Sequence, residues 1–415
     1  MAELLSVDLA LERILSDKTR LPAEQVALDD ALDRVLAEDI TADISIPAFA
    51  NSSMDGYAVR AADVQNASSS APVSLRVVAD IPAGTFPTIM LRQGEAARIM
   101  TGAPLPSGAD AVVPVEHTDS VFSQDGMTPP PEQIQVFQAL GSGDYVRPAG
   151  EDIEAGQRVL AAGTLLRAQE IGVLAALGRA VVPVIRRPRV AILSTGNELT
   201  EVGKPLQPGA IYDSNSHTLA GLVRTHGGEA IRIPRALDTQ EDVRRRFQQA
   251  LDAEPDIVIS SAGVSVGAFD VVRTVLAELG QVDFWRINLR PGKPLAYGHL
   301  GGVPFFGLPG NPVSAMITFD VFVRPVMMAL SGRPDSWTTI QVVAGHAFDS
   351  DGRRSYLRVK LQRENGLVIA TTTGTQSSGA LTSMVLADAL LIIPEGVRRV
   401  EAGAVLEARL LRPIV

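Results

Sequence analysis

Hydrophobic positions between residues 186 and 330 fall into short, continuously apolar runs that alternate with amphipathic stretches of helical period. The runs Val190–Leu193 and Asp256–Ser260 are examples, and each is followed directly by serine. Continuously apolar strands joined by helices indicate a parallel sheet covered on both faces. The pattern therefore predicts a doubly wound parallel α/β domain over residues 186–332. Its expected strands are 190–193, 230–233, 256–260 and 282–289, and its expected helices are 214–225, 241–251, 271–279 and one that begins at Asn311-Pro312.

Strand-like alternation dominates two further parts of the chain. Residues 46–145 hold short β-rich runs, such as Val73–Val78 and Glu95–Met100, between clusters of Gly, Pro and Ser, which predicts a small β-domain. After a linker at Arg333-Pro334, alternating apolar runs return and predict a C-terminal β-barrel or sandwich over residues 333–415. Those runs cover residues 340–343, 356–361, 367–372, 389–393 and 405–410.

Helical spacing of apolar residues marks the N-terminal region. Residues 2–38 carry it on both sides of Leu21-Pro22, which predicts two helices. A short helix is expected over Gln169–Leu177, ending at Gly178 as a left-handed cap. We expect this helix to pack against the first two. Residues 1–45 and 146–185 would then form a linker and dimerisation domain, with the β-domain of residues 46–145 inserted into it.

Composition removes several function classes. The formal net charge of −10 among 415 residues argues against sequence-independent nucleic-acid binding, which needs a basic surface. The chain has no cysteine and 5 scattered histidines, so a thiolate or zinc site is not expected. Soft ligands for a transition metal would have to come from a substrate. No apolar run is expected to reach the length needed to span a membrane, and the N-terminus lacks a signal-peptide core, so the cytoplasm is the expected location, without membrane attachment.

Four loops of the α/β domain follow the carboxyl ends of its strands, where open parallel sheets bind ligands. Their Gly and Ser residues let backbone N–H groups approach an anion, and a helix start adds unsatisfied donors. Any one such loop is more often a simple turn, but four at one sheet edge favour a nucleotide or phosphorylated ligand. Arg286, Arg290 and Lys293 would supply positive charge. The loops are residues 194–198, 260–267, 290–294 and 307–314.

Three distinctive segments in the N-terminal half, together with these loops, carry a family resemblance. They are Pro47–Ala58 (with Asn51-Ser52-Ser53-Met54-Asp55-Gly56-Tyr57), Arg98–Pro104 and Gly150–Ile153. With them the chain resembles the MoeA family, which includes the corresponding domain of gephyrin, over essentially its whole length. The resemblance implies a homodimer with the active site at the subunit interface. It also implies insertion of molybdate into adenylylated molybdopterin with release of AMP, assisted by magnesium.

The resemblance also assigns roles to individual residues. The residues expected to be catalytic are Asp55, Thr101, Asp152, Glu198 and Asp270. Glu198, Asp238 and Asp270 are expected to bind Mg²⁺, which prefers oxygen ligands. Residues expected to contact the substrates are Arg147, Ser194, Thr195, Gly196, Asp238, Ser261, Gly263, Ser265, Gly267, Arg286, Arg290, Lys293, Pro309, Gly310, Asn311, Pro312, Ser314, Arg358 and Ser378.

Several of these residues also have a purely structural interpretation. Asp55 could build a turn before Gly56, Glu198 could complement a helix dipole, and Asp270 could cap the helix after it. Asp238 with Thr239 reads more readily as a helix cap than as a ligand. Three positions depart from the family pattern. Asn197 replaces a frequent Asp, and arginines at 286 and 290 replace frequent lysines, which leaves the metal ligands and molybdate contacts open.

Two alternative functions stay open beside the first. A molybdopterin adenylyltransferase has a single domain that resembles residues 186–330, but the additional domains and the Asp55 segment argue against it. A gephyrin-like scaffold without catalysis would need a groove for a partner peptide. Other proteins of molybdenum-cofactor synthesis are possible partners, and nucleic acid is not expected to be one.

Overall fold

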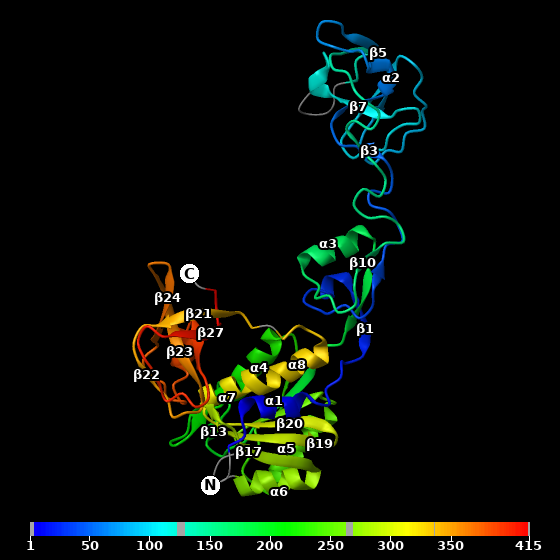
Figure 1. Cartoon of the computed structure of the whole chain (residues 1–415). Coiled ribbons are helices and arrows are strands. Elements are labelled where there is room, and N and C mark those ends of the chain that lie inside the picture. Colours follow the sequence, from blue (N-terminus) through cyan, green and yellow to red (C-terminus); the bar gives the residue numbers. More distant parts are fainter. Residues whose placement is uncertain (1–3, 123–128, 263–268, 336, 414–415) are drawn as a thin grey trace. The chain divides into compact units, whose positions relative to one another are not determined.

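The computed structural model describes residues 4–122, 129–262, 269–335 and 337–413. The chain divides into two compact units (Figure 1). The first comprises Met1–Val26, Asp33–Ala37 and Pro183–Val415, and the second comprises Ala27–Leu32 and Glu38–Val182. Each unit has its own hydrophobic clusters, so each is described by itself.

A six-stranded sheet forms the centre of the first unit. Its order is β15 (Glu229–Arg232), β12 (Arg189–Ser194), β16 (Ile257–Ser261), β20 (Val303–Leu308), β19 (Pro294–Leu300) and β17 (Gly280–Arg286). The first four strands are parallel, as the apolar runs predicted. β19 runs antiparallel to both neighbours. The sequence pattern did not indicate the β19–β20 hairpin, because its turn is Gly301-Gly302 and Gly298 interrupts the apolar run.

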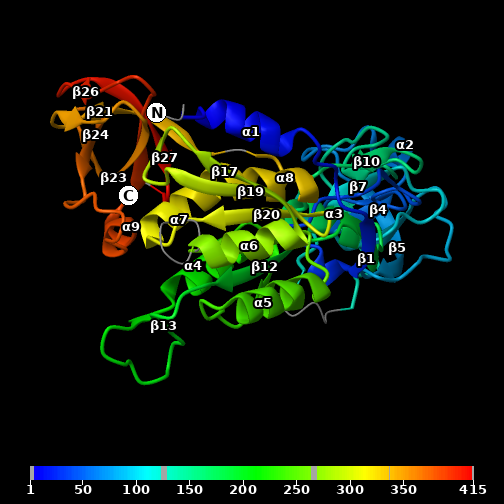
Figure 2. The ribbon, with the colours of Figure 1, turned by 90° about the horizontal axis from the view of Figure 1, so that it is seen from below.

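Helices cover both faces of this sheet (Figure 2). Alternate residues of β12 point to opposite faces, so that Val190 and Ile192 enter one buried cluster and Ala191 and Leu193 enter the other. The first cluster contains α1 (Val7–Leu15), α4 (Ser214–Thr225) and the helical run α7 (Pro312–Thr318), η3 (Phe319–Val323, a π-helix) and α8 (Arg324–Ser331). The second contains α5 (Gln240–Asp252) and α6 (Phe269–Leu279).

The helical run Pro312–Ser331 corrects the expectation that no apolar segment reaches membrane-spanning length. By length and composition it is the one candidate span among the described residues, at 20 residues. Of its most apolar window, 89% is buried inside the fold. This burial is that of a central core helix, since Phe319 and Phe322 are fully buried in the cluster shared with the sheet.

The C-terminal strands of the first unit close into a barrel, as predicted. β23 (Arg354–Glu364), β24 (Leu367–Thr372), β21 (Thr339–Ala344), β27 (Val405–Leu410) and β25 (Ala389–Ile393) pair in this order, and β25 pairs back with β23. The short β18 (Leu289–Arg290), which leads into the 290–294 loop, pairs with β23. The barrel and the loop at the sheet edge are therefore joined by backbone hydrogen bonding. The small elements of this part are β22 (Phe348–Asp349), β26 (Arg399–Val400) and α9 (Thr382–Leu386).

The second unit contains a five-stranded sheet and smaller ladders. The sheet order is β7 (Ala111–Pro114), β4 (Gly56–Val59), β6 (Glu95–Ile99), β5 (Val73–Ile81) and β8 (Gln133–Val136). β4 was not predicted, although the Asp55 segment leads directly into it. A Cβ atom at Gly56 would collide with the Val113 carbonyl oxygen, so only glycine allows this close strand approach. The other elements are η1 (Leu28–Asp30), β2 (Ile40–Thr41), β3 (Asn51–Ser52), α2 (Ala61–Val64), η2 (Val115–His117), β9 (Val146–Arg147), β10 (Arg158–Leu160) and α3 (Ala168–Ala176).

The prediction of a second N-terminal helix is wrong. Ala23–Ala27 is a strand, β1, in a two-stranded ladder with β11 (Val181–Ile185). Its residues alternate between exposed and half-buried. This period of two is that of a strand, and pairing with β11 favours it over the weaker helical spacing of the apolar residues. Asp33, with a φ of 61°, then breaks any helical continuation. The helix over 168–176 therefore packs against η1, while α1 packs against α8.

Candidate active site

A cleft of about 680 Å³ lies between the loops at the carboxyl edge of the α/β sheet and one end of the barrel. Three of the four predicted loops line it, and the described part of the fourth, Ser261-Ala262, does so too. The predicted residues that line the cleft are Ser194, Glu198, Ser261, Arg290, Lys293, Pro309, Gly310, Asn311, Pro312, Ser314, Arg358 and Ser378.

Asn311 joins the start of α7 to the barrel. It occupies the N-cap position with Pro312 after it, but its side chain makes no cap bond. Instead its Nδ2 donates to Ser378 Oγ at 2.8 Å, and the N–H of Val313 donates to the Ser378 carbonyl at 3.1 Å. The polar groups at this helix start are thus held against a barrel loop at the rim of the cleft.

Two residues that the sequence did not single out fix the sheet-edge loops to one another. Asn215 Nδ2 donates to Ser261 Oγ at 2.8 Å and to the Gly310 carbonyl at 2.7 Å. Asp213 caps α4 by accepting from Ser216 N and also accepts from Ser194 Oγ, both at 3.0 Å. The sequence could have pointed to these two residues. Both lie at the expected start of the 214–225 helix, where polar side chains face a sheet edge.

One wall of the cleft is strongly basic. Arg290, Lys293 and Arg358 line it, and none has a carboxylate partner among the described side chains. Arg358 is 1% exposed; its Nε donates to Ser383 Oγ at 3.1 Å and its Nη2 to the Ser377 carbonyl at 3.0 Å. Burial, with a smaller contribution from Arg290, lowers the pKa of Arg358 to about 10. A buried cation without a counter-charge is costly, which indicates a site for an anion.

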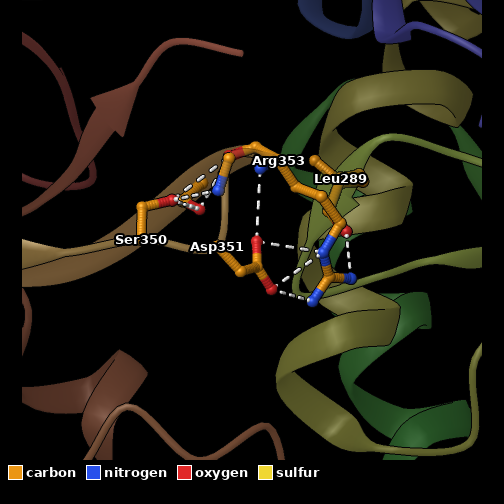
Figure 3. A network of polar contacts seen from close by, with 6 residues as sticks. Leu289, Ser350, Asp351 and Arg353 are labelled. Atoms are coloured by element: carbon orange, nitrogen blue, oxygen red, sulfur yellow. Dashed lines mark hydrogen bonds and ion pairs between the residues drawn. The ribbon is translucent and has the colours of Figure 1, made fainter. Parts of the chain in front are cut away.

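Arg353 has a different role, because its charge is already paired (Figure 3). Its guanidinium binds both carboxylate oxygens of Asp351, with the shortest bond at 2.6 Å, and donates to the Leu289 carbonyl at 3.0 Å. The hydrogen bond from Arg353 holds the pKa of Asp351 below its usual value. Arg353 thus positions the strand that leads to Arg290. Arg353 and Gln376 both line the cleft. The sequence did not identify either of them as a site residue, because it does not show which barrel loops face the sheet.

Two carboxylates lie on or next to the 194–198 loop: Glu198, which lines the cleft, and Asp238, which does not line it but bonds to Asn197. Glu198 lines the cleft and its carboxylate lies over Gly196, whose φ of 144° and missing Cβ make room for it. Asp238 Oδ2 accepts from Asn197 N at 3.0 Å, and Asn197 Oδ1 accepts from Asp238 N at 3.1 Å. Asp238 Oδ1 is buried without a hydrogen-bond partner. The helix cap predicted at Asp238-Thr239 is supplied by Thr239, whose hydroxyl accepts from Asp242 N at the start of α5, and not by Asp238.

Other predicted residues of the first unit lie apart from the cleft wall or outside the described residues. Thr195 is buried with its hydroxyl unpartnered, and Gly196 lies beside it. Arg286 ends β17, where it pairs in register with Pro294, next to Lys293. Gly263, Ser265 and Gly267 lie outside the described residues, as does the side chain of Asp270, whose backbone belongs to α6.

The four predicted residues of the second unit are all exposed. Asp55 Oδ1 accepts from both the N–H and the hydroxyl of Thr101, each at 2.7 Å. The Asp55 carboxylate therefore bonds to a distant loop and does not build the turn before Gly56. Arg147 lies on β9, paired with β3, and the N–H of Asp152 donates to the Ile46 carbonyl at 3.0 Å.

The oxygen ligands fit a magnesium ion. Within the described residues, no group of three or more His, Cys, Asp or Glu side chains is close enough to form a complete metal site. Mg²⁺ commonly uses only one or two carboxylates and completes its shell with water and substrate phosphates. The unpartnered buried oxygen of Asp238, and Glu198 at the cleft, are suitable donors of this kind.

Three family models match consecutive parts of the chain: the MoeA N-terminal region (domain I and II) at residues 5–178, a probable molybdopterin binding domain at 191–329, and the MoeA C-terminal region (domain IV) at 341–411. Molybdopterin molybdenumtransferase 2 of Mycobacterium tuberculosis (strain CDC 1551 / Oshkosh) is 40% identical over 92% of this chain and 93% of its own length. Molybdopterin molybdenumtransferase of Nostoc sp. (strain PCC 7120) is 41% identical over 92% and 87%.

Solved structures agree with these sequence matches. The molybdopterin biosynthesis MoeA protein of Pyrococcus horikosii is 35% identical and superposes with a TM-score of 0.83, covering 99% of this chain and 100% of that one. A second MoeA structure, from Pyrococcus horikoshii OT3, gives 30% identity and a TM-score of 0.79. The fold, the order of the domains and the sequence identity all agree with those of MoeA proteins. The chain therefore belongs to the MoeA family.

Proposed function

We propose that this protein inserts molybdate into adenylylated molybdopterin and releases AMP, the last step in forming molybdenum cofactor. The observation that carries the proposal is the basic wall of the cleft, where Arg290, Lys293 and the buried Arg358 have no carboxylate partner among the described side chains. The relatives named molybdopterin molybdenumtransferase support the same reaction.

The basic wall suits a tetrahedral oxyanion. Molybdate carries two negative charges, and a guanidinium group offers it two parallel N–H donors. Since Arg358 is already desolvated, bound molybdate would supply the missing counter-charge with little further loss of hydration. Ser378 lies at the same end of the cleft and adds a hydroxyl. The chain has no cysteine, so the molybdenum would be received by the sulfurs of the substrate dithiolene.

The rest of the cleft suits the phosphoanhydride of the substrate. Gly310, Asn311 and Ser314, around the start of α7, line the same space as Lys293. We place Mg²⁺ at Glu198 and Asp238, with Asp270 as a further ligand from the family resemblance. When bound, the ion stabilises negative charge on the phosphates as AMP leaves. Asn215 and Asp213 keep the loops fixed, which orients the substrate for that step.

The family resemblance further implies a homodimer that acts in the cytoplasm. In it, Asp55, Thr101, Arg147 and Asp152 of one subunit complete the cleft of the other. Mixing an inactive Asp55→Asn protein with an inactive Glu198→Gln protein tests this arrangement. Subunit exchange should restore up to about a quarter of the activity, because one of the two sites in each mixed dimer is intact and half the dimers are mixed. No recovery, with mixed dimers verified by two affinity tags, would contradict the shared site.

The reaction itself is tested by incubating the protein with adenylylated molybdopterin, with and without molybdate and Mg²⁺. We expect AMP release that requires both and equals the molybdenum incorporated. The adenylyltransferase alternative predicts a different result, namely adenylyl transfer from ATP to molybdopterin. A scaffold predicts neither reaction and undiminished cofactor output from Glu198→Ala.

A further inference from the structure

A second cavity of about 700 Å³, here called the outer pocket, lies beside the cleft in the first unit. Its basic residues are Lys204, Arg232, Arg235, Arg245 and Arg246. The segment Leu199–Asp213 contributes to both cavities, and Asp213 lines both. We propose that the outer pocket is a separate binding site for a phosphate group, distinct from the molybdate-binding wall of the cleft.

The charges of the outer pocket do not balance. Its acidic residues are Glu201, Asp213 and Asp242. Glu201 pairs with Lys204 at 2.7 Å, and Asp242 is shared between Arg245 and Arg246. Asp213 is occupied by the α4 cap and the Ser194 hydroxyl. Five cations therefore face three carboxylates, in a protein whose net charge is −10.

The two arginines left without a carboxylate partner in the described part of the pocket are Arg232 and Arg235. Arg232 Nε donates to Ser216 Oγ and Arg235 Nη1 donates to the Gly196 carbonyl, each at a long 3.3 Å. Arg246 Nε is buried without a hydrogen-bond partner. Among the described residues, the guanidinium groups of Arg232 and Arg235 make only these two side-chain hydrogen bonds. Planar guanidinium groups around one cavity match the oxygens of a phosphate dianion.

Hydrogen bonds of Arg235 and Asp242 connect the outer pocket to the 194–198 loop and to the segment before Asp238. Arg235 holds the carbonyl of Gly196, the residue over which the Glu198 carboxylate lies. On the other side, Asp242 Oδ2 accepts from Leu237 N at 2.8 Å, one residue before Asp238. A phosphate group that draws on Arg235 or on the Asp242 pairs would therefore act on the backbone positions of both proposed magnesium ligands.

Equilibrium dialysis with radiolabelled inorganic phosphate tests the site on the full chain. The measurement uses a Lys293→Gln background, so that binding in the cleft is weakened. We expect one phosphate per chain, and a roughly tenfold or greater loss of affinity in Arg232→Gln and in Arg235→Gln, since each removes a charge-assisted bond. Arg244→Gln is the control for overall charge, because Arg244 lies on α5 beside the pocket residues Arg245 and Arg246 but pairs with Glu278 outside the pocket. Thermal unfolding verifies that each variant is folded.

Two outcomes would overturn the proposal. One is unchanged phosphate binding in Arg232→Gln and Arg235→Gln, and the other is an equal loss in Arg244→Gln, which would reduce the effect to overall charge. Repeating the dialysis with AMP as competitor separates the sources of the phosphate group. Displacement of the bound phosphate by AMP in the Lys293→Gln protein indicates a phosphomonoester ligand, and no displacement indicates free phosphate. Because AMP release by the enzyme is measured separately, failure of this site leaves the proposed reaction untouched.

Discussion

Replacing Arg358 by methionine should leave the stability of the protein nearly unchanged while strongly weakening its affinity for molybdate. The side chain is 1% exposed and its pKa is lowered to about 10, which corresponds to a cost of about 3 kcal/mol for the charged form in the folded state. Against this stand the hydrogen bonds to Ser383 Oγ and to the Ser377 carbonyl, worth about 1.5 kcal/mol each because the donor is charged. The two contributions nearly cancel, so Arg358→Met should change the free energy of unfolding by less than about 1 kcal/mol.

The sign of the pH dependence follows from the same shift. A base whose pKa is lowered in the folded state destabilises the fold at every pH below that folded pKa, and the cost disappears as the pH rises above it. The stability difference between Arg358→Met and the wild type should therefore be constant from pH 6 to 9, and the wild type should gain stability relative to the variant above about pH 10.

Urea unfolding and molybdate titration measure the two effects. Molybdate binding should weaken by roughly a hundredfold, since charge-assisted bonds are lost. Arg363→Met, an exposed residue of the same strand β23, should change neither quantity and is the matched control. If Arg358→Met instead lost more than about 2 kcal/mol of stability, or bound molybdate normally, Arg358 would be a structural residue and the argument for the basic wall would fail.

Three further outcomes follow. Asp238→Asn should weaken Mg²⁺ binding by roughly tenfold, measured by competition with Mn²⁺, and normal binding would exclude its unpartnered oxygen as a ligand. Asn215→Leu removes the bonds to Ser261 and Gly310 and should lower thermal stability by about 2 kcal/mol; an unchanged melting temperature would mean that the loops hold without it. The pKa of Glu170 is lowered to about 2, chiefly by its hydrogen bond to Arg167, so its stabilisation is present above about pH 4.5 and lost as the pH falls through 2. Glu170→Gln should accordingly be less stable than the wild type at pH 7 and equal to it near pH 2, and a pH-independent difference would contradict this.

Regular alternation and regular helical period were enough to predict most of the elements that position the site. The strands β24, β25 and β27 and the helix α4 coincide with the predicted ranges. β1 was missed because pairing with another strand overrides a weak helical spacing. β19 was missed because glycine breaks its apolar pattern where strands approach closely.

The loops of the candidate site were predictable to a similar degree. Gly- and Ser-rich segments at strand ends identify a sheet edge that binds anions, and Arg290 and Lys293 lie within them. Arg353 and Gln376 come from barrel loops that reach the sheet only because β18 pairs with β23. Such long-range pairing leaves no local signal in the sequence. The buried, unpaired state of Arg358 likewise emerges only from the packing of the barrel.

Molybdate-dependent release of AMP from adenylylated molybdopterin, followed in the wild type and in Arg358→Gln, tests the central claim most directly. If the basic wall binds the incoming oxyanion, the molybdate concentration for half-maximal release should rise by a factor of ten or more in Arg358→Gln, with an unchanged requirement for Mg²⁺. AMP release that is independent of molybdate, or an unaltered molybdate dependence in this variant, would contradict the account.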